Sequence, residues 1–133
     1  MNFQIRVPMP IQWADMDALG HVNNTVYFTW FETARIALFL ELGLKVGELG
    51  KVGPILATTT CNFRLPLAFP GDVECCAGIS KIGNTSFTMA YAVLKDGELA
   101  ADGSGVVVLL DYTTNSKVPI PDEMRAILER LQV

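Results

Sequence analysis

The segment of residues 25–42 constrains the fold more than any other part of the sequence. Asn23 and Asn24 precede it as good N-cap residues, and Gly43 follows it as a typical helix stop. Only three of its residues are charged, and its apolar side chains are distributed almost all round a helix. A helix of this composition is expected to be enclosed by other structure rather than to lie on a surface.

The segment before this helix has the alternation of a β-strand. Every odd position in residues 3–13 is apolar, which predicts one strand over that range. Pro8 and Pro10 lie on one side of that strand, and neither has an N–H to donate. Such a side is tolerated only where no neighbouring strand pairs with it. We therefore expect an edge strand.

Four more strands are expected after the helix, over residues 55–64, 72–82, 85–95 and 98–110. Asp96-Gly97 is a strong signal for a two-residue hairpin, and Gly83-Asn84 is a second. A closing helix is expected over residues 121–131, with Pro121 at its first helical position. This order of elements is α+β. We expect one domain, residues 1–133, with a five-stranded antiparallel sheet wrapped around a long central helix, the arrangement called the hotdog fold.

The composition limits the partners and ligands of the chain. Half of its residues are hydrophobic, which is enough to build one core, and its net charge is -4. We therefore expect no broad surface for nucleic acid or for anionic lipid.

No leader and no apolar stretch of about 18 residues is recognised, so a cytoplasmic protein is expected. Cys61, Cys75 and Cys76 are expected to be reduced core thiols without a metal.

One passage carries a specific resemblance to a known family. Residues 13–27 read WADMDALGHVNNTVY, and they resemble the acyl-CoA thioesterases of the 4-hydroxybenzoyl-CoA thioesterase-like hotdog family that have D-x-D-x-x-G-H-V-N-N after the first strand. The resemblance extends in element order over nearly the whole chain. It implies that Asp17 is the catalytic carboxylate and that the backbone N–H of Asn24 polarises the thioester carbonyl. It also implies a homodimer or homotetramer with the active site between two protomers.

Plant acyl-carrier-protein thioesterases are similar at a greater distance. Their Asp, Asn and His residues occur at spacings that fall on Asp17, Leu19 and His21 of this chain. Leu19 departs from that pattern. A mechanism that uses a side-chain amide at this position is therefore not expected here.

The residue types suit thioester cleavage, although each also has a structural interpretation. A thiolate leaves readily, so one carboxylate acting as nucleophile or general base, together with an oxyanion site at a helix N-terminus, would suffice. His21 is also expected to take part in catalysis by orienting water or Asp17. From the residues alone, Asp17 could instead cap a turn or a helix, and His21 could be a hydrogen-bonded structural residue. Asp15 is expected to bind loop amides, because a metal site at D-x-D lacks further ligands nearby.

Residues outside this passage are expected to help bind the substrate. Coenzyme A carries several phosphates, so an acidic chain needs local cations and turn amides to hold it, and the alternative for such a turn is an ordinary hairpin with a solvated lysine. No cofactor is expected, because coenzyme A is part of the substrate. The residues expected to contact substrate are Asn23, Tyr27, Lys81, Asn84, Thr85 and Ser86.

Glu32 and Arg35 are expected to form an ion pair at the rim of the helix or at a subunit contact, since their spacing is i, i+3.

Two other functions are compatible with a pocket for an acyl thioester. One is hydration or dehydration of an enoyl thioester, which hotdog hydratases perform with Asp and His five residues apart, whereas Asp17 and His21 are four apart. The other is non-catalytic acyl-CoA binding. Neither the acyl chain nor the choice between coenzyme A and acyl-carrier protein can be read from the pattern.

Overall fold

The computed structural model describes residues 2–44 and 50–133. The helices are a short 3-10 helix η1 (Trp13–Asp15), α1 (Asn24–Glu41) and α2 (Asp122–Arg130). The strands are β1 (Ile5–Pro10), β2 (Val52–Phe63), β3 (Asp72–Ile82), β4 (Ser86–Lys95), β5 (Glu98–Asp111) and β6 (Ser116–Lys117).

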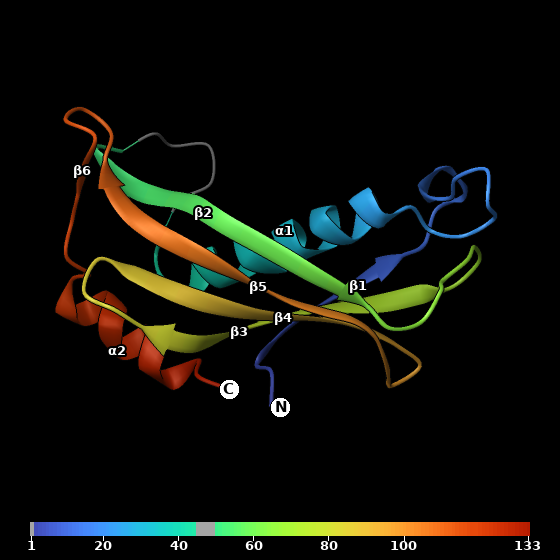
Figure 1. Ribbon diagram of the computed structural model, residues 1–133. Helices are drawn as coiled ribbons and strands as arrows, with labels where there is room; N and C mark the ends of the chain where they lie inside the picture. Colours follow the sequence, from blue (N-terminus) through green and yellow to red (C-terminus); the bar gives the residue numbers. More distant parts are fainter. Residues whose placement is uncertain (1, 45–49) are drawn as a thin grey trace.

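All strands belong to one antiparallel sheet in the order β1-β3-β4-β5-β2, with β6 paired to β5 (Figure 1). The predicted α+β class is therefore confirmed, and the five expected strands are all present. The expected number of five is wrong, because Ser116–Lys117 adds a sixth strand. Two paired residues are too few to leave an alternation that the sequence could reveal.

The first strand is an edge strand, as the prolines predict. β1 pairs only with β3, and the N–H of Ile11 donates to the Gly71 carbonyl. Because successive backbone N–H groups of a strand point to opposite sides, the backbone nitrogens of Pro8 and Pro10 point away from β3. The predicted length over residues 3–13 is wrong. The strand ends at Pro10, and Trp13 lies in η1 with 72% of its surface exposed. Apolar alternation continues past the strand because the η1 turn also presents an apolar residue at an odd position.

Helix α1 begins and ends where the sequence signals predict. The Asn23 side chain caps it by accepting a hydrogen bond from the Thr25 N–H, and Gly43 follows the last turn with a φ of +81°. The helix packs against the sheet through a buried flank made of Tyr27, Trp30, Phe31, Ala34, Arg35, Leu38 and Phe39.

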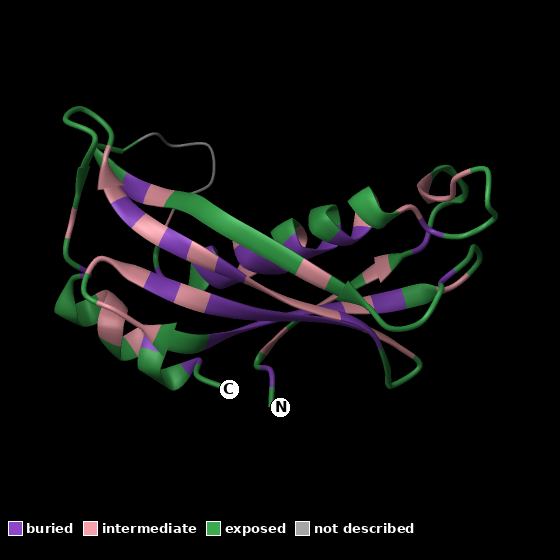
Figure 2. Cartoon of the chain, viewed as in Figure 1, coloured by how far each residue is buried: buried purple, intermediate pink, exposed green. Residues whose placement is uncertain are grey.

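The opposite flank of α1 is not enclosed by this chain, which corrects the expectation of a helix buried all round. Phe28 and Leu40 are exposed, and Glu32 lies exposed between them (Figure 2). Strand β2 at the second edge of the sheet is also exposed along most of its length. One curved sheet of these strands covers only the side of the helix that faces it.

The remaining turns and the closing helix agree closely with the sequence signals. Asp96 and Gly97 both have positive φ, as a two-residue hairpin turn requires. The β3–β4 turn has three residues rather than the expected two, Gly83–Thr85 standing between the strands. Helix α2 starts at Asp122, with Pro121 as its N-cap instead of its first residue.

The adjacent cysteines of β3 point to opposite faces of the sheet. Cys75 packs in the large core beneath α1, whereas Cys76 packs in a separate cluster with Phe3, Ala90 and Ala92. All three cysteines are free, as expected. No described helix is long and apolar enough to cross a membrane.

Candidate active site

The loop between β1 and α1 is shaped by Asp15. Its carboxylate accepts a 2.7 Å hydrogen bond from the Gln12 N–H, which closes the η1 turn, and its carbonyl accepts a 3.0 Å hydrogen bond from the Asn23 N–H. Both bonds join parts of the same loop. The expectation that Asp15 binds loop amides is confirmed.

Asp17 lies in the same loop and has both carboxylate oxygens bound to donors. The Leu19 N–H donates to Oδ1 over 2.9 Å, and the Asn23 side-chain amide donates to Oδ2 over 3.0 Å. These two hydrogen bonds, that of Leu19 first, hold the pKa of the Asp17 carboxyl below its usual value, and nearby His21 acts in the same direction. Asp17 is therefore ionised at neutral pH.

The N-terminus of α1 lies directly beside this carboxylate. Asn23 accepts hydrogen bonds from Thr25 N–H and Thr25 Oγ1 at 2.9 and 2.7 Å, which satisfies one of the free donors of the first turn. Within the described residues, the Asn24 N–H has no hydrogen-bond acceptor. It is thus available to an oxygen of a bound molecule.

A cavity of about 280 Å³ brings these groups together. Asp17, His21, Asn24 and Tyr27 all line it. Tyr27 is buried, and its ring meets that of Phe63 edge to face with centroids 5.1 Å apart. His21 is exposed at the cavity. Asn23 is not among the lining residues, because its side chain is turned towards Asp17 and Thr25.

The sequence interpretation missed one wall of the cavity. The end of β2 and the bend that follows it form this wall, through Phe63, Arg64, Leu65 and Pro66. The bend leads to β3, whose first residues pair with the end of β1, and the Val22 N–H donates to the Leu67 carbonyl over 2.7 Å. The two edges of the sheet meet at the Asp17 loop only because of the strand order, which no local pattern in the sequence reveals.

The second group of expected substrate contacts lies far from Asp17 in this chain. Lys81, Asn84, Thr85 and Ser86 surround the turn at the end of β3, whereas Asp72 at its start pairs with Pro10 beside the Asp17 loop. Ten residues of strand separate Asp72 from Ile82, a span of about 33 Å. Figure 1 shows the turn and the start of α1 at opposite ends of the molecule.

Glu32 and Arg35 form the expected ion pair, with 3.7 Å between Arg35 Nη2 and Glu32 Oε2. The environment of Arg35 differs from the expectation, because only 8% of its surface is exposed. Its guanidinium reaches into the core and donates to the Tyr91 hydroxyl. The pair also lines a groove of about 220 Å³ between α1 and β2, together with Phe28, Thr29, Leu56 and Thr59.

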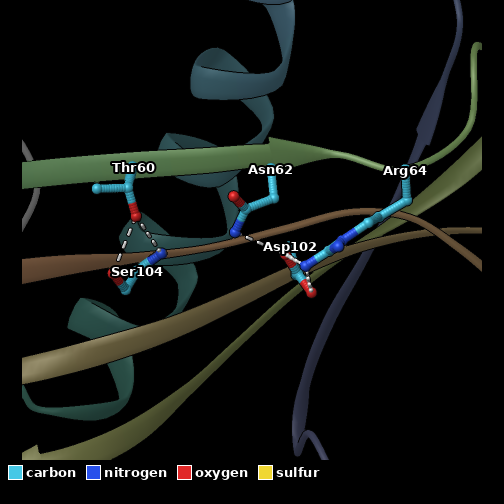
Figure 3. Close-up of polar contacts among 5 residues, drawn as sticks. All are labelled: Thr60, Asn62, Arg64, Asp102 and Ser104. Carbon is cyan, nitrogen blue, oxygen red and sulfur yellow. Dashed lines mark hydrogen bonds and ion pairs between the residues drawn. The ribbon is translucent and has the colours of Figure 1, made fainter.

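A larger cavity, of about 580 Å³, lies on the sheet face opposite α1 and lacks this chemistry. Ala90 and Ala92, which pack with Cys76 on that face, line it. The one carboxylate that lines it, Asp102, already accepts hydrogen bonds from Asn62 and Arg64 (Figure 3). Its size is therefore not a sign of a catalytic site, and the smaller cavity at Asp17 is the candidate active site.

Comparison with known proteins shows the family of the chain. A family model described as the thioesterase-like superfamily matches residues 11–128. The chain belongs to this superfamily. The hotdog thioesterase recognised from residues 13–27 is thereby confirmed.

Several solved structures resemble this thioesterase-like chain along almost its full length. The PA5185 protein from Pseudomonas aeruginosa is 31% identical with a TM-score of 0.87, covering 98% of this chain and 92% of that one. A thioesterase from Thermus thermophilus, solved with coenzyme A and Zn, is 30% identical with a TM-score of 0.86, covering 98% and 95%. The gentisyl-coenzyme A thioesterase BH1999 is 27% identical with a TM-score of 0.82, covering 92% and 98%. Together they support thioester hydrolysis as the activity.

The Thermus thermophilus structure was solved with Zn, and the loop of this chain offers two carboxylates, Asp15 and Asp17. Among the described residues, no three His, Cys, Asp or Glu side chains gather in a way that could hold a metal ion. The described residues around Asp17 therefore do not provide a full set of ligands for such an ion.

Proposed function

We propose that this chain hydrolyses acyl-CoA thioesters, with Asp17 as nucleophile or general base and the N-terminus of α1 as the oxyanion site. One observation carries the proposal. Asp17, whose carboxylate is ionised, and Asn24, whose N–H has no acceptor among the described residues, line the same cavity. An acyl transfer reaction needs this pair of groups, an electron-rich oxygen and a donor for the developing negative charge.

Either role of Asp17 gives a complete reaction. As a nucleophile, its carboxylate adds to the thioester carbonyl, the C–S bond breaks, coenzyme A leaves as a thiolate, and water then hydrolyses the mixed anhydride. As a general base, Asp17 takes a proton from a water molecule whose oxygen adds to the carbonyl, and the tetrahedral intermediate then collapses as the C–S bond breaks and coenzyme A leaves as a thiolate. In both cases the Asn24 N–H and the partial positive charge of the helix end stabilise the oxyanion, and one such donor contributes ~3 kcal/mol.

Coenzyme A as the thiol carrier is supported by what similar proteins bind. The Thermus thermophilus thioesterase was solved with coenzyme A, and BH1999 is a gentisyl-coenzyme A thioesterase. Lys81 and its turn lie at the far end of β3 from Asp17, so they contribute to this site only if a second protomer supplies them. We infer that Lys81, Asn84, Thr85 and Ser86 of one protomer bind the coenzyme A of another.

A homo-oligomer is supported by the exposed edge and flank of the chain. β2 is an edge strand of 12 residues with unpaired backbone groups on its free side, which is a ready template for another strand. Leu56 on β2 and Phe28 on α1 are exposed apolar residues that line the groove, and Ile55 and Leu40 are further exposed apolar residues of the same two elements. A second copy of the chain would cover both.

The test is a screen of thiol release from short, medium, long and aromatic acyl-CoAs, with wild type beside Asp17→Asn. The amide is isosteric with the carboxylate but neither attacks a carbonyl nor takes a proton from water. Turnover is expected to fall about a hundredfold or more. Protein thiols should add little background, because burial raises the pKa of Cys61 to about 11 and that of Cys75 to about 12.

The screen needs two controls, one for folding and one for substrate binding. Thermal melting should show Asp17→Asn as folded as the wild type, and calorimetry should show that it still binds a coenzyme A thioester. Affinity without turnover in the wild type would identify a binding protein, and product analysis showing added or lost water across a double bond would identify a hydratase. Normal turnover by Asp17→Asn would contradict the assignment of the catalytic residue.

A further inference from the structure

We propose that Asn23 is a positioning residue that holds the Asp17 carboxylate in register with the N–H groups at the start of α1. Asn23 is expected from the sequence to cap the helix and to contact substrate. Its side chain does cap α1, and it also binds the Asp17 carboxylate. This inference rests on the proposed function and assigns a role to a residue that does not line the cavity.

The side chain of Asn23 is fully engaged on both of its polar atoms. Its Oδ1 accepts from Thr25 N–H and Thr25 Oγ1 at 2.9 and 2.7 Å. Because an amide has its acceptor and its donor on opposite branches, this fixes Nδ2 on the side of Asp17, to which it donates over 3.0 Å. A rotated amide would place its donor against the Thr25 N–H and its oxygen against a carboxylate, so only one orientation is stable.

The backbone of Asn23 is held as firmly as its side chain. Its N–H donates to the Asp15 carbonyl over 3.0 Å, and its φ and ψ of -65° and 145° lead directly into the first helical residue. That residue is Asn24, which lines the cavity together with Asp17. The nucleophile or base and the oxyanion donor are therefore tied together through one amino acid.

The same contact selects the charged form of Asp17 and leaves it able to react. An ionised carboxylate has about four acceptor positions, and Leu19 and Asn23 occupy one on each oxygen. One lone pair on each oxygen thus stays free for the carbonyl carbon or for water. Two anchors also stop the carboxylate from rotating, and a misplacement of about 1 Å can cost a hundredfold in rate.

The cap role and the positioning role can be separated by substitution. Asn23→Ser keeps a good N-cap oxygen but loses the donor to Asp17, so its melting temperature should stay near that of wild type while kcat falls about tenfold or more. KM should change little, since Asn23 does not line the cavity. The acid limb of the kcat/KM profile should move to higher pH, because Asp17 has lost a hydrogen bond to its charged form.

Two further variants and a matched control sharpen the test. Asn23→Asp keeps the cap but places a second carboxylate against Asp17, so the acid limb should move further upward. Asn23→Ala should show the kinetic change of Asn23→Ser and also melt at a lower temperature. Asp111→Ala removes a similar pair of hydrogen bonds, to Thr113 N–H and Oγ1 at 2.9 and 2.6 Å, at the far end of β5. It should lower the melting temperature without moving the acid limb.

A measurement that needs no activity completes the experiment. Titration of the Asp17 carboxyl carbon by NMR should give a higher pKa in Asn23→Ser than in wild type. An unchanged Asp17 titration, or an Asn23→Ser enzyme with the kcat and acid limb of wild type, would overturn the positioning role. A wild-type chain that releases no thiol from any thioester would instead overturn the proposed function, and the NMR titration would still decide whether Asn23 governs Asp17.

Discussion

The guanidinium of Arg35 donates a hydrogen bond of 3.1 Å to the hydroxyl of Tyr91 inside the core. Tyr91 is buried and stacks on Phe31, with ring centroids 4.7 Å apart. Arg35 has one other polar partner among the described residues, Glu32 at 3.7 Å, whose side chain is mostly exposed. The hydroxyl of Tyr91 is therefore the main compensation for burying a charged side chain within this chain.

We expect Tyr91→Phe to destabilise the fold by about 1–2 kcal/mol, because it leaves a buried donor of Arg35 without its acceptor while keeping the ring stacking. Urea unfolding measures this free energy. Tyr112→Phe is the matched control, since its hydroxyl donates to the Pro54 carbonyl over 2.9 Å at an exposed position. Water replaces that bond, so the control should lose less. Equal losses in both variants would contradict the special role of the buried pair.

Asp15 and His21, two further polar residues of the loop, should differ from Asp17 in the kind of defect that their substitution produces. Asp15→Asn weakens the bond that closes the η1 turn, so we expect a lower melting temperature and only a secondary loss of turnover. His21→Ala should retain the melting temperature and lose part of the turnover, because His21 lines the cavity without a side-chain hydrogen bond to the described residues. Thiol release and thermal melting on both variants check this. Loss of activity in Asp15→Asn with an unchanged melting temperature would reverse the assignment.

The pH dependence of turnover should reflect the lowered pKa of Asp17. The carboxyl titrates below its ordinary value of 3.8, so the reactive form is present throughout the range from about pH 5 to 7. The lowered pKa also links stability to pH. The ionised Asp17 stabilises the fold fully above its pKa in the unfolded chain, and this stabilisation is lost as the pH falls through its lower pKa in the folded chain. A kcat/KM profile at several pH values checks this, and an acid limb near pH 6 would indicate that a group other than Asp17 controls the reaction.

The exposed edge of the sheet should mediate self-association. Leu56→Lys places a charge beside the free edge of β2 and the groove that Phe28 lines, so we expect it to shift the oligomer towards monomer. Leu99→Lys is the control, because Leu99 is similarly exposed but follows the β4–β5 hairpin on another strand. Light scattering at micromolar concentration measures the mass. A monomeric wild type would contradict the oligomer, and dissociation by Leu99→Lys alone would place the interface elsewhere.

The elements of the fold were predictable from local pattern. The Asn23 cap and the stop at Gly43 bound α1 to within one residue, and Asp96-Gly97 marked the β4–β5 hairpin, because caps and turns depend on a few neighbouring residues. Pro8 and Pro10 indicated an edge strand because neither has an N–H to donate to a neighbouring strand. Asp17, His21, Asn24 and Tyr27 were all assigned to the site from one passage, and the cavity contains all four.

Tertiary structure alone decided which distant residues meet. Arg64 and Phe63 line the same cavity as Asp17 because the bend after β2 leads to the start of β3, which pairs with the end of β1. Lys81 lies far away because β3 is extended. The engagement of Asn23 with Asp17 and the burial of Arg35 against Tyr91 are likewise invisible in the sequence. Hydrophobic periodicity and helix caps depend on residues close together in the sequence. These contacts join residues that are distant in the sequence or depend on how the elements pack, so they are decided by the order of the strands and by the packing of side chains.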